Sequence, residues 1–208
     1  MASITRQRRD ADRQSGSEQR LLDAVERLLN AGQLFTEISV QRILEEAGVS
    51  RATFYAHFRD KSALLIRLTD TLRERLLDLA RAWDPAAGED GAARYAEFFL
   101  EVIRIHRENF AVLSAVRELA SYDPAVHDFY TADLDEFERA VCQTLTEQQR
   151  SGATISELSP VAASRVIVWG GAQAIAHHIS VDDGSGDTQF ARELGAIWWH
   201  GAYRRPAP

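Results

Sequence analysis

Apolar residues recur at steps of three and four along almost the whole chain, which is the period of an amphipathic helix. We find no stretch of strict apolar and polar alternation bounded by hairpin turn residues. The pattern therefore predicts an all-α fold of about nine helices. Their expected ranges are 17–31, 40–47, 51–57, 60–84, 95–106, 110–119, 125–149, 160–180 and 187–203.

Small polar residues and glycines mark the boundaries of the early helices. Ser17 has the chemistry of an N-cap for the first helix, whose apolar stripe begins at Leu21. Ser39 and Ser50 are expected to cap the second and third helices, and Gly48 separates those two.

The composition is that of an ordinary globular protein. With 208 residues and 45% hydrophobic side chains, the chain can bury a core, which excludes disordered and disulfide-stapled classes. The lone Cys142 cannot form an internal disulfide, and no apolar run follows the arginines of the N-terminus as in a secretory signal. We therefore expect a cytoplasmic location.

The net charge of -7 conceals an uneven distribution. Residues 1–67 carry 11 Lys and Arg against 9 Asp and Glu, whereas 68–208 carry 13 against 22. Because a polyanion responds to where the charge lies, only the first third offers a plausible face for nucleic acid.

Two short helices, 40–47 and 51–57, have the proportions of a helix-turn-helix, in which the second helix enters the major groove. Phe54 and Phe58 are expected to point inward, which leaves polar side chains on the outer face of 51–57. On spacing alone, a tight helical hairpin inside a bundle explains the same pattern equally well.

A resemblance adds to this. The segment from Ile43 to Leu65 reads ILEEAGVSRATFYAHFRDKSALL and closely resembles the N-terminal domain of the TetR family of bacterial transcriptional regulators. The resemblance implies a homodimeric, ligand-responsive repressor that binds a pseudo-palindromic double-stranded DNA operator. It divides the chain into a helix-turn-helix domain over 17–66 and a helical ligand-binding and dimerisation domain over 67–208.

Carried over position by position, the resemblance also implies which side chains meet DNA. Those at the start of helix 51–57 would face bases and phosphates, and later ones would contact phosphates, with one weaker position in the preceding helix. The implied residues are Gln41, Arg51, Ala52, Thr53, Tyr55, His57 and Lys61.

Residues 1–16 are predicted to form a disordered basic arm. Arg6, Arg8, Arg9 and Arg13 lie there among Ser, Gln and Asp. Such a tail commonly only solubilises a protein, and the alternative is that it follows a DNA groove once DNA is bound.

The C-terminal part is predicted to hold an effector pocket lined by apolar and aromatic side chains with a few polar ones. Each polar member could equally be a satisfied core group, and the lack of a compact charged cluster points to a small, largely apolar effector. The predicted lining is Phe99, His106, Phe110, Tyr130, Trp169, Gln173 and His177.

Helix 160–180 is too apolar to have one face in water. A membrane span would fit its length, but Arg165 and two histidines argue against it, so we expect a partner copy to cover one face. The resemblance agrees, because this family usually dimerises through its last two helices, and the ending of this chain is similar to the EthR branch. The predicted dimer residues are Gly170, Gly171, Ala174, Trp198, Trp199 and Tyr203.

Two other classes of function remain to be weighed. An enzyme is not expected, because the chain lacks HExxH, paired cysteines, GxSxG, a phosphate loop and a dinucleotide fingerprint. No cofactor or metal is implied. A helical interaction module that has lost specific DNA binding stays open as the alternative to a repressor.

Overall fold

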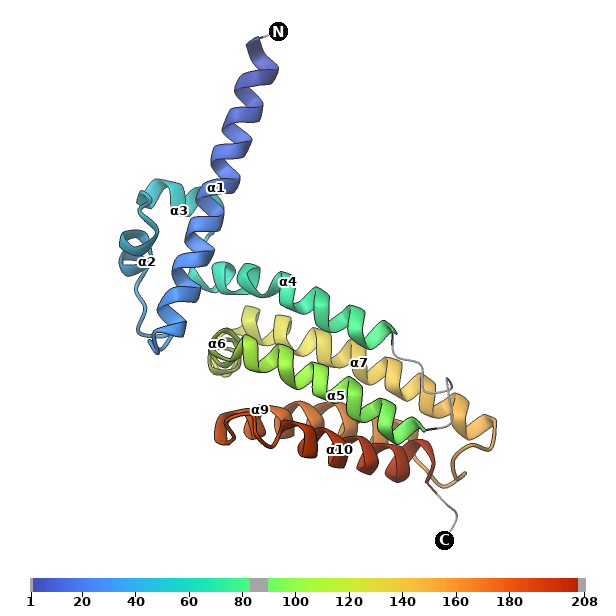
Figure 1. Ribbon diagram of the computed structural model, residues 1–208. Coiled ribbons are helices and arrows are strands. Elements are labelled where there is room, and N and C mark those ends of the chain that lie inside the picture. Colours follow the sequence, from blue (N-terminus) through green and yellow to red (C-terminus); the bar gives the residue numbers. More distant parts are fainter. Residues whose placement is uncertain (1, 83–89, 206–208) are drawn as a thin grey trace. The chain divides into compact units, whose positions relative to one another are not determined.

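The computed structural model describes residues 2–82 and 90–205, and these residues form helices joined by short turns, with no strand among them (Figure 1). The all-α prediction is confirmed, and so are nine helical stretches when α8–η1–α9 and α10–η2 are each counted as one continuous helix. The segments η1 and η2 are π-helical turns within them. The bounds are α1 Ala2–Asn30, α2 Val40–Ala47, α3 Arg51–His57, α4 Lys61–Ala82, α5 Gly91–Glu108, α6 Phe110–Ala120, α7 Pro124–Arg150, α8 Pro160–Arg165, η1 Val166–Gly170, α9 Gly171–Val181, α10 Asp187–Trp198 and η2 Trp199–Tyr203.

The predicted caps of the short helices are present. Ser39 and Ser50 have extended backbones, and each side chain accepts a hydrogen bond from the amide three residues on. Gly48 adopts the left-handed conformation, with φ of 63°, and so ends α2 where a side chain would be strained. Asp60 accepts from the amide of Ala63 at 2.7 Å and opens α4.

The first helix begins much earlier than predicted. It starts at Ala2, within the stretch 1–16 for which the sequence predicts an arm, so Ser17 lies inside the helix and its prediction as the N-cap is wrong. The segment before Gly16 is rich in Ala, Arg and Gln, which are good helix formers, and one interior glycine costs only about 1 kcal/mol. The predicted end of helix 60–84, with Trp83, lies outside the described residues.

Packing divides the chain into two compact units. The first unit comprises the chain up to Thr71 together with Ala111–Tyr130, and the second comprises Leu72–Phe110 together with the chain from Thr131 on. This division differs from the sequence-based boundary at 66/67, because α6 and the start of α7 pack with the helix-turn-helix. Val112, Val116 and Leu119 of α6 are buried in the same core as the early helices.

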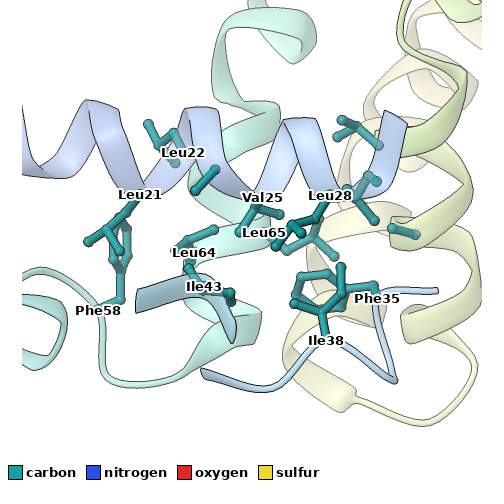
Figure 2. Close-up of a cluster of buried hydrophobic side chains, with 14 of the residues drawn as sticks. Leu21, Leu22, Val25, Leu28, Phe35, Ile38, Ile43, Phe58, Leu64 and Leu65 are labelled. Atoms are coloured by element: carbon teal, nitrogen blue, oxygen red, sulfur yellow. The ribbon is translucent and has the colours of Figure 1, made fainter. Parts of the chain in front are cut away.

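The core of the first unit is built on one face of α1. Leu21, Val25 and Leu28 project from that face toward Ile43 and Leu64 (Figure 2). Phe54 is fully buried beside them, and burying a side chain of this size contributes about 1.5–3 kcal/mol. Helices α1, α2 and α3 therefore share one hydrophobic core.

The core of the second unit is aromatic. Helices α5 and α10 make its most extensive helix contact. Tyr95 stacks on Phe99 at 5.7 Å between ring centroids, and Trp198 meets Phe99 edge-on at 4.5 Å. Burial raises the pKa of Tyr203 to about 12. Within the described residues, none of the helices combines the length and the apolar character that a membrane span needs.

Candidate nucleic-acid interface

Helix α3 presents a polar outer face on a buried support. Phe54 and Phe58 are buried, as the spacing predicted, at 0% and 5% exposure. Arg51, Ala52 and Tyr55 are exposed, and Tyr55 keeps 51% of its surface open. Thr53 and His57 are half-buried at the edges of this face. The helix thus presents a guanidinium, a phenol and a methyl group on the surface of the protein.

Neighbouring groups hold these side chains in place. The Arg51 guanidinium lies 6.0 Å from the centroid of the Tyr55 ring, and that ring meets Phe54 edge-on at 5.2 Å. The Thr53 hydroxyl is 2.8 Å from that of Ser50. On α2, Gln41 is exposed and donates to Glu45 at 3.0 Å. The outer face therefore has a defined arrangement before any ligand arrives.

His57 is tied to the first helix. Its Nε2 lies 2.8 Å from the Oγ of Ser17, a residue that is 6% exposed and 40 positions away. The hydrogen bond leaves Nδ1 as the nitrogen that can meet an external group. Because the two residues are distant in sequence and Ser17 looks like an ordinary N-cap, no local signal predicted this pair.

Lys61 is turned toward its own chain. Its Nζ donates to three carbonyl oxygens of the α1–α2 connection, those of Phe35 at 2.9 Å, Thr36 at 3.1 Å and Ile38 at 3.2 Å. An ammonium has three donors, so these bonds account for all of them. Burial lowers the pKa of Lys61, which nearby Glu118 partly offsets. Its DNA contact stays a prediction, while the structure gives it a role in fixing the loop.

Polar contacts join α6 and the α6–α7 turn to the same loop and to α4. Thr36 donates to Glu118 at 2.9 Å, and Ser62 donates to Asp123 at 2.6 Å. The Ser62 bond holds the pKa of Asp123 below its usual range. The loop that Lys61 closes is thus also attached to α6.

Comparison with known proteins agrees with this geometry. The family model for bacterial regulatory proteins of the tetR family matches residues 21–68. The HTH-type transcriptional regulator EthR of Mycolicibacterium smegmatis is 31% identical over 153 residues, which cover 71% of this chain and 68% of that protein. The chain belongs to the TetR family. It is therefore a TetR-family transcriptional regulator with a DNA-binding helix-turn-helix, and both its family and this relative are regulators rather than enzymes.

Solved structures of TetR-type regulators share the fold. NalD of Pseudomonas aeruginosa superposes with a TM-score of 0.69 at 18% identity, covering 91% of this chain and 98% of that one. A transcriptional regulator from Rhodococcus sp. Rha1 gives 0.68 at 16% identity, covering 93% and 99%. At such identities the likeness concerns the fold alone.

The predicted effector-pocket residues of this TetR-family chain have varied surroundings. Phe99 is buried among aromatic rings, whereas Phe110 is 37% exposed. His106 hydrogen-bonds through Nδ1 to the carbonyl of Val102 in its own helix, at 2.8 Å.

The remaining members of that set also have partners or face outward. Trp169 donates to Glu138 at 2.9 Å. Gln173 and His177 are exposed, and Tyr130 packs on the core of the first unit. Within the second unit, Gln173 and His177 therefore do not join Phe99 in a common buried site. Helical periodicity placed Gln173 and His177 on an apolar helix, but it did not show which side of that helix is buried.

Half of the predicted dimer residues have intramolecular partners instead. Trp199 and Tyr203 are 8% and 1% exposed in their own unit, which leaves them little surface for a partner chain, and as dimer contacts they stay predictions. Gly171 is also buried, and a Cβ there would collide with the Trp198 ring. The large aromatic side chains and the close helix approach at Gly171 are present, but the contacts are made with α5 and α9 of the same chain.

The other three have some open surface. Gly170 is exposed, and a Cβ added there would meet nothing within 4 Å, while Ala174 and Trp198 are partly exposed. As dimer contacts, these three stay predictions.

One group of possible metal ligands exists among the described residues, formed by His178, Asp182 and Asp187. Arg107 of α5 already binds this group. The Arg107 guanidinium donates to both oxygens of Asp187, at 2.6 and 3.0 Å, and to the carbonyl of Asp182. His178 adds a hydrogen bond to Asp187 at 2.9 Å. The cluster of Arg107, His178, Asp182 and Asp187 is therefore a set of ion pairs and hydrogen bonds that joins α5 to the α9–α10 turn, and we call it the α5 latch.

This latch gives a pH prediction. The bond from Arg107 holds the pKa of Asp187 below its usual value, so the stabilisation is present above about pH 4 and is lost as the pH falls through the folded-state pKa. Asp187→Asn should cost about 1–2 kcal/mol at neutral pH, and the difference from wild type should shrink between about pH 5 and pH 2. Urea unfolding across that range measures it. Glu157→Gln, which changes an exposed carboxylate of the same unit, should show no such convergence.

Proposed function

We propose that this TetR-family regulator is a homodimeric repressor that binds a pseudo-palindromic duplex operator and is released by a small, largely apolar effector. The observation that carries the proposal is the exposed polar face of α3 on a rigidly supported head. The proposed DNA contacts are Gln41, Arg51, Ala52, Thr53, Tyr55 and His57, with Lys61 acting mainly through the loop that it holds.

Each contact has a chemical rationale. The fork of Arg51 suits the two acceptors of guanine, and the exposed methyl of Ala52 suits that of thymine. The Tyr55 hydroxyl and the free Nδ1 of His57 suit phosphate oxygens. A two-fold dimer would present two such helices to half-sites about 34 Å apart, one turn of the duplex.

Exposed apolar side chains on the last two helical stretches support a dimer. Val166 is 73% exposed, Ile197 is 64% and Val161 is 55%, which is unusual for side chains of this kind. Together with Gly170 and Ala174, they form the revised set that we propose for the partner contact. An effector would then act by favouring a spacing of the two heads that no longer fits successive grooves.

The relatives support the same role without specifying the effector. NalD is described as the secondary repressor of a multidrug efflux pump in its own organism. A transcriptional regulator from Saccharomonospora viridis, 18% identical, was solved with choline. Regulation of a gene in response to a small organic molecule is therefore a reasonable function for this chain.

The test begins with DNA duplexes that the full-length protein selects from a random-sequence library. Fluorescence anisotropy then measures the affinity of the protein for these duplexes. Wild type should prefer a selected duplex over random competitor, with affinity that falls steeply with salt. Arg51→Ala should cost about 1–3 kcal/mol, or about 5- to 150-fold in Kd, and relax sequence preference at one position. Arg150→Ala removes an exposed arginine of α7 and serves as the matched control.

Two further measurements complete the test. Sedimentation of the protein should give the mass of a dimer, and compounds screened for release of the duplex would identify the effector. Selection that enriches no sequence would contradict the repressor and favour an interaction module without specific DNA binding.

A further inference from the structure

An open hollow of about 710 Å³ lies between α1 and α3, beside the outer face of the recognition helix. One wall is α1, with Gly16, Ser17 and Arg20. The other wall is α3, and its lining residues are Ala52, Thr53, Ala56 and His57. The two alanine methyl groups and the glycine, which has no side chain, leave room, while two hydroxyls, an imidazole and a guanidinium surround the space.

Arg20 brings an unneutralised positive charge to this hollow. The arginines Arg27, Arg42 and Arg67 of the same unit all pair with carboxylates. Arg20 is exposed, and it makes no such pair with any residue from Ser15 to Ala82 or from Asp90 to Arg205 whose side chain the structure describes. The acids nearest to it in sequence are engaged elsewhere, since Glu18 pairs with Arg67 and Asp23 accepts from Gln19.

The imidazole of the hollow is held in a fixed orientation. The Ser17 hydroxyl occupies Nε2 of His57, so Nδ1 is the nitrogen that remains for an incoming group. A guanidinium, a hydroxyl and an imidazole around an open space form a set of donors that suits a phosphate. The neighbouring face of α3 carries the proposed base contacts, and a helix in the major groove has sugar-phosphate backbone on either side.

We propose that this hollow is a subsite for one backbone phosphate of bound DNA, with Arg20 as the charged contact and Ser17 as a positioning residue for His57. The inference rests on the proposed DNA-binding function and extends the contact surface from α3 to α1.

Removing the charge tests the subsite. With the full-length protein and a selected duplex, Arg20→Gln should weaken binding about tenfold at low salt, the value of one charge-assisted hydrogen bond. It should also lower the slope of log K against log salt by about one. Arg150→Gln, which removes the same charge from an exposed site on α7, should change neither quantity.

A neutral-phosphate scan locates the contact. Replacing each phosphate of the duplex in turn by methylphosphonate should weaken wild-type binding at a few positions. At the position served by Arg20, the Arg20→Gln variant should show no further loss. Equal losses for wild type and variant at every position would overturn the subsite.

The role of Ser17 is tested by a double-mutant cycle. Ser17→Ala should weaken DNA binding, because it removes the hydrogen bond that orients the imidazole of His57. In a His57→Ala background the same substitution should have no effect on binding. Additive losses would show that Ser17 acts on the fold instead of through His57.

The two possible failures are distinguishable. If wild type selects no duplex from the library, the proposed DNA-binding function itself fails. If wild type binds a selected duplex and Arg20→Gln keeps its affinity, salt slope and methylphosphonate pattern, only the subsite is wrong.

Discussion

Gly195→Ala is expected to lower the free energy of unfolding by about 1–3 kcal/mol, although it adds a single methyl group to a helix. A Cβ at residue 195 would lie 2.7 Å from the amide nitrogen of Ala96 and 3.0 Å from the carbonyl oxygen of Ala92. Both atoms belong to the backbone of α5, so no side-chain rotation relieves the collision. Helices α5 and α10 would have to separate, which loosens the aromatic core around Tyr95.

Chemical denaturation followed by tryptophan fluorescence measures this effect, because Trp198 and Trp199 lie in that core. Gly201→Ala is the matched control, since the same methyl at that position meets nothing within 4 Å. It should be neutral or stabilising by up to about 1 kcal/mol, because alanine loses less entropy in a helix than glycine. Equal stability of the two variants would show that α5 and α10 are not in close backbone contact.

Lys61→Met is expected to destabilise the first unit by about 1.5–3 kcal/mol and to weaken DNA binding as a consequence. Methionine keeps the apolar stem but removes all three donors to the α1–α2 loop. The carbonyls of Phe35 and Ile38 are partly buried, so water replaces the ammonium poorly. The loop that sets the position of α2 relative to α1 then becomes mobile.

Amide hydrogen exchange separates this mechanism from a lost phosphate contact. Lys61→Met should raise exchange over 33–39 and α2, with little change in the second unit. Arg59→Met, which removes a positive charge that is 70% exposed two residues earlier, should leave exchange unchanged. Unchanged protection in Lys61→Met together with weaker DNA binding would mean that the lysine acts on DNA directly.

Features that depend on a few neighbouring residues could be predicted from the sequence. The caps at Ser39 and Ser50 and the left-handed Gly48 involve atoms within three or four positions, so local chemistry determines them. The inward direction of Phe54 follows from helical periodicity alone. These local features also define the outer face of α3, and so the main part of the proposed site was accessible from the sequence.

Features that depend on distant partners could not be predicted. The sequence predicts that a second chain covers Trp199 and Tyr203, and nothing in it distinguishes that cover from α5 of the same chain. Lys61 looked like a surface cation because the carbonyls that accept its hydrogen bonds lie more than twenty residues away and leave no pattern in side-chain identity. Ser17 illustrates the same limit, since a good capping residue also makes a good hydrogen-bond partner inside a helix.

The chain enters and leaves the first unit more than once, and this affects its biosynthesis. The unit holds the chain up to Thr71, loses it at Leu72 and regains it from Ala111 to Tyr130. On the ribosome, the N-terminal helices therefore wait several seconds for α6 to emerge and cover their apolar surface. For the same reason, a gene fragment cut after Thr71 would encode a DNA-binding head with part of its core exposed, and such a fragment should aggregate unless it is extended through Tyr130.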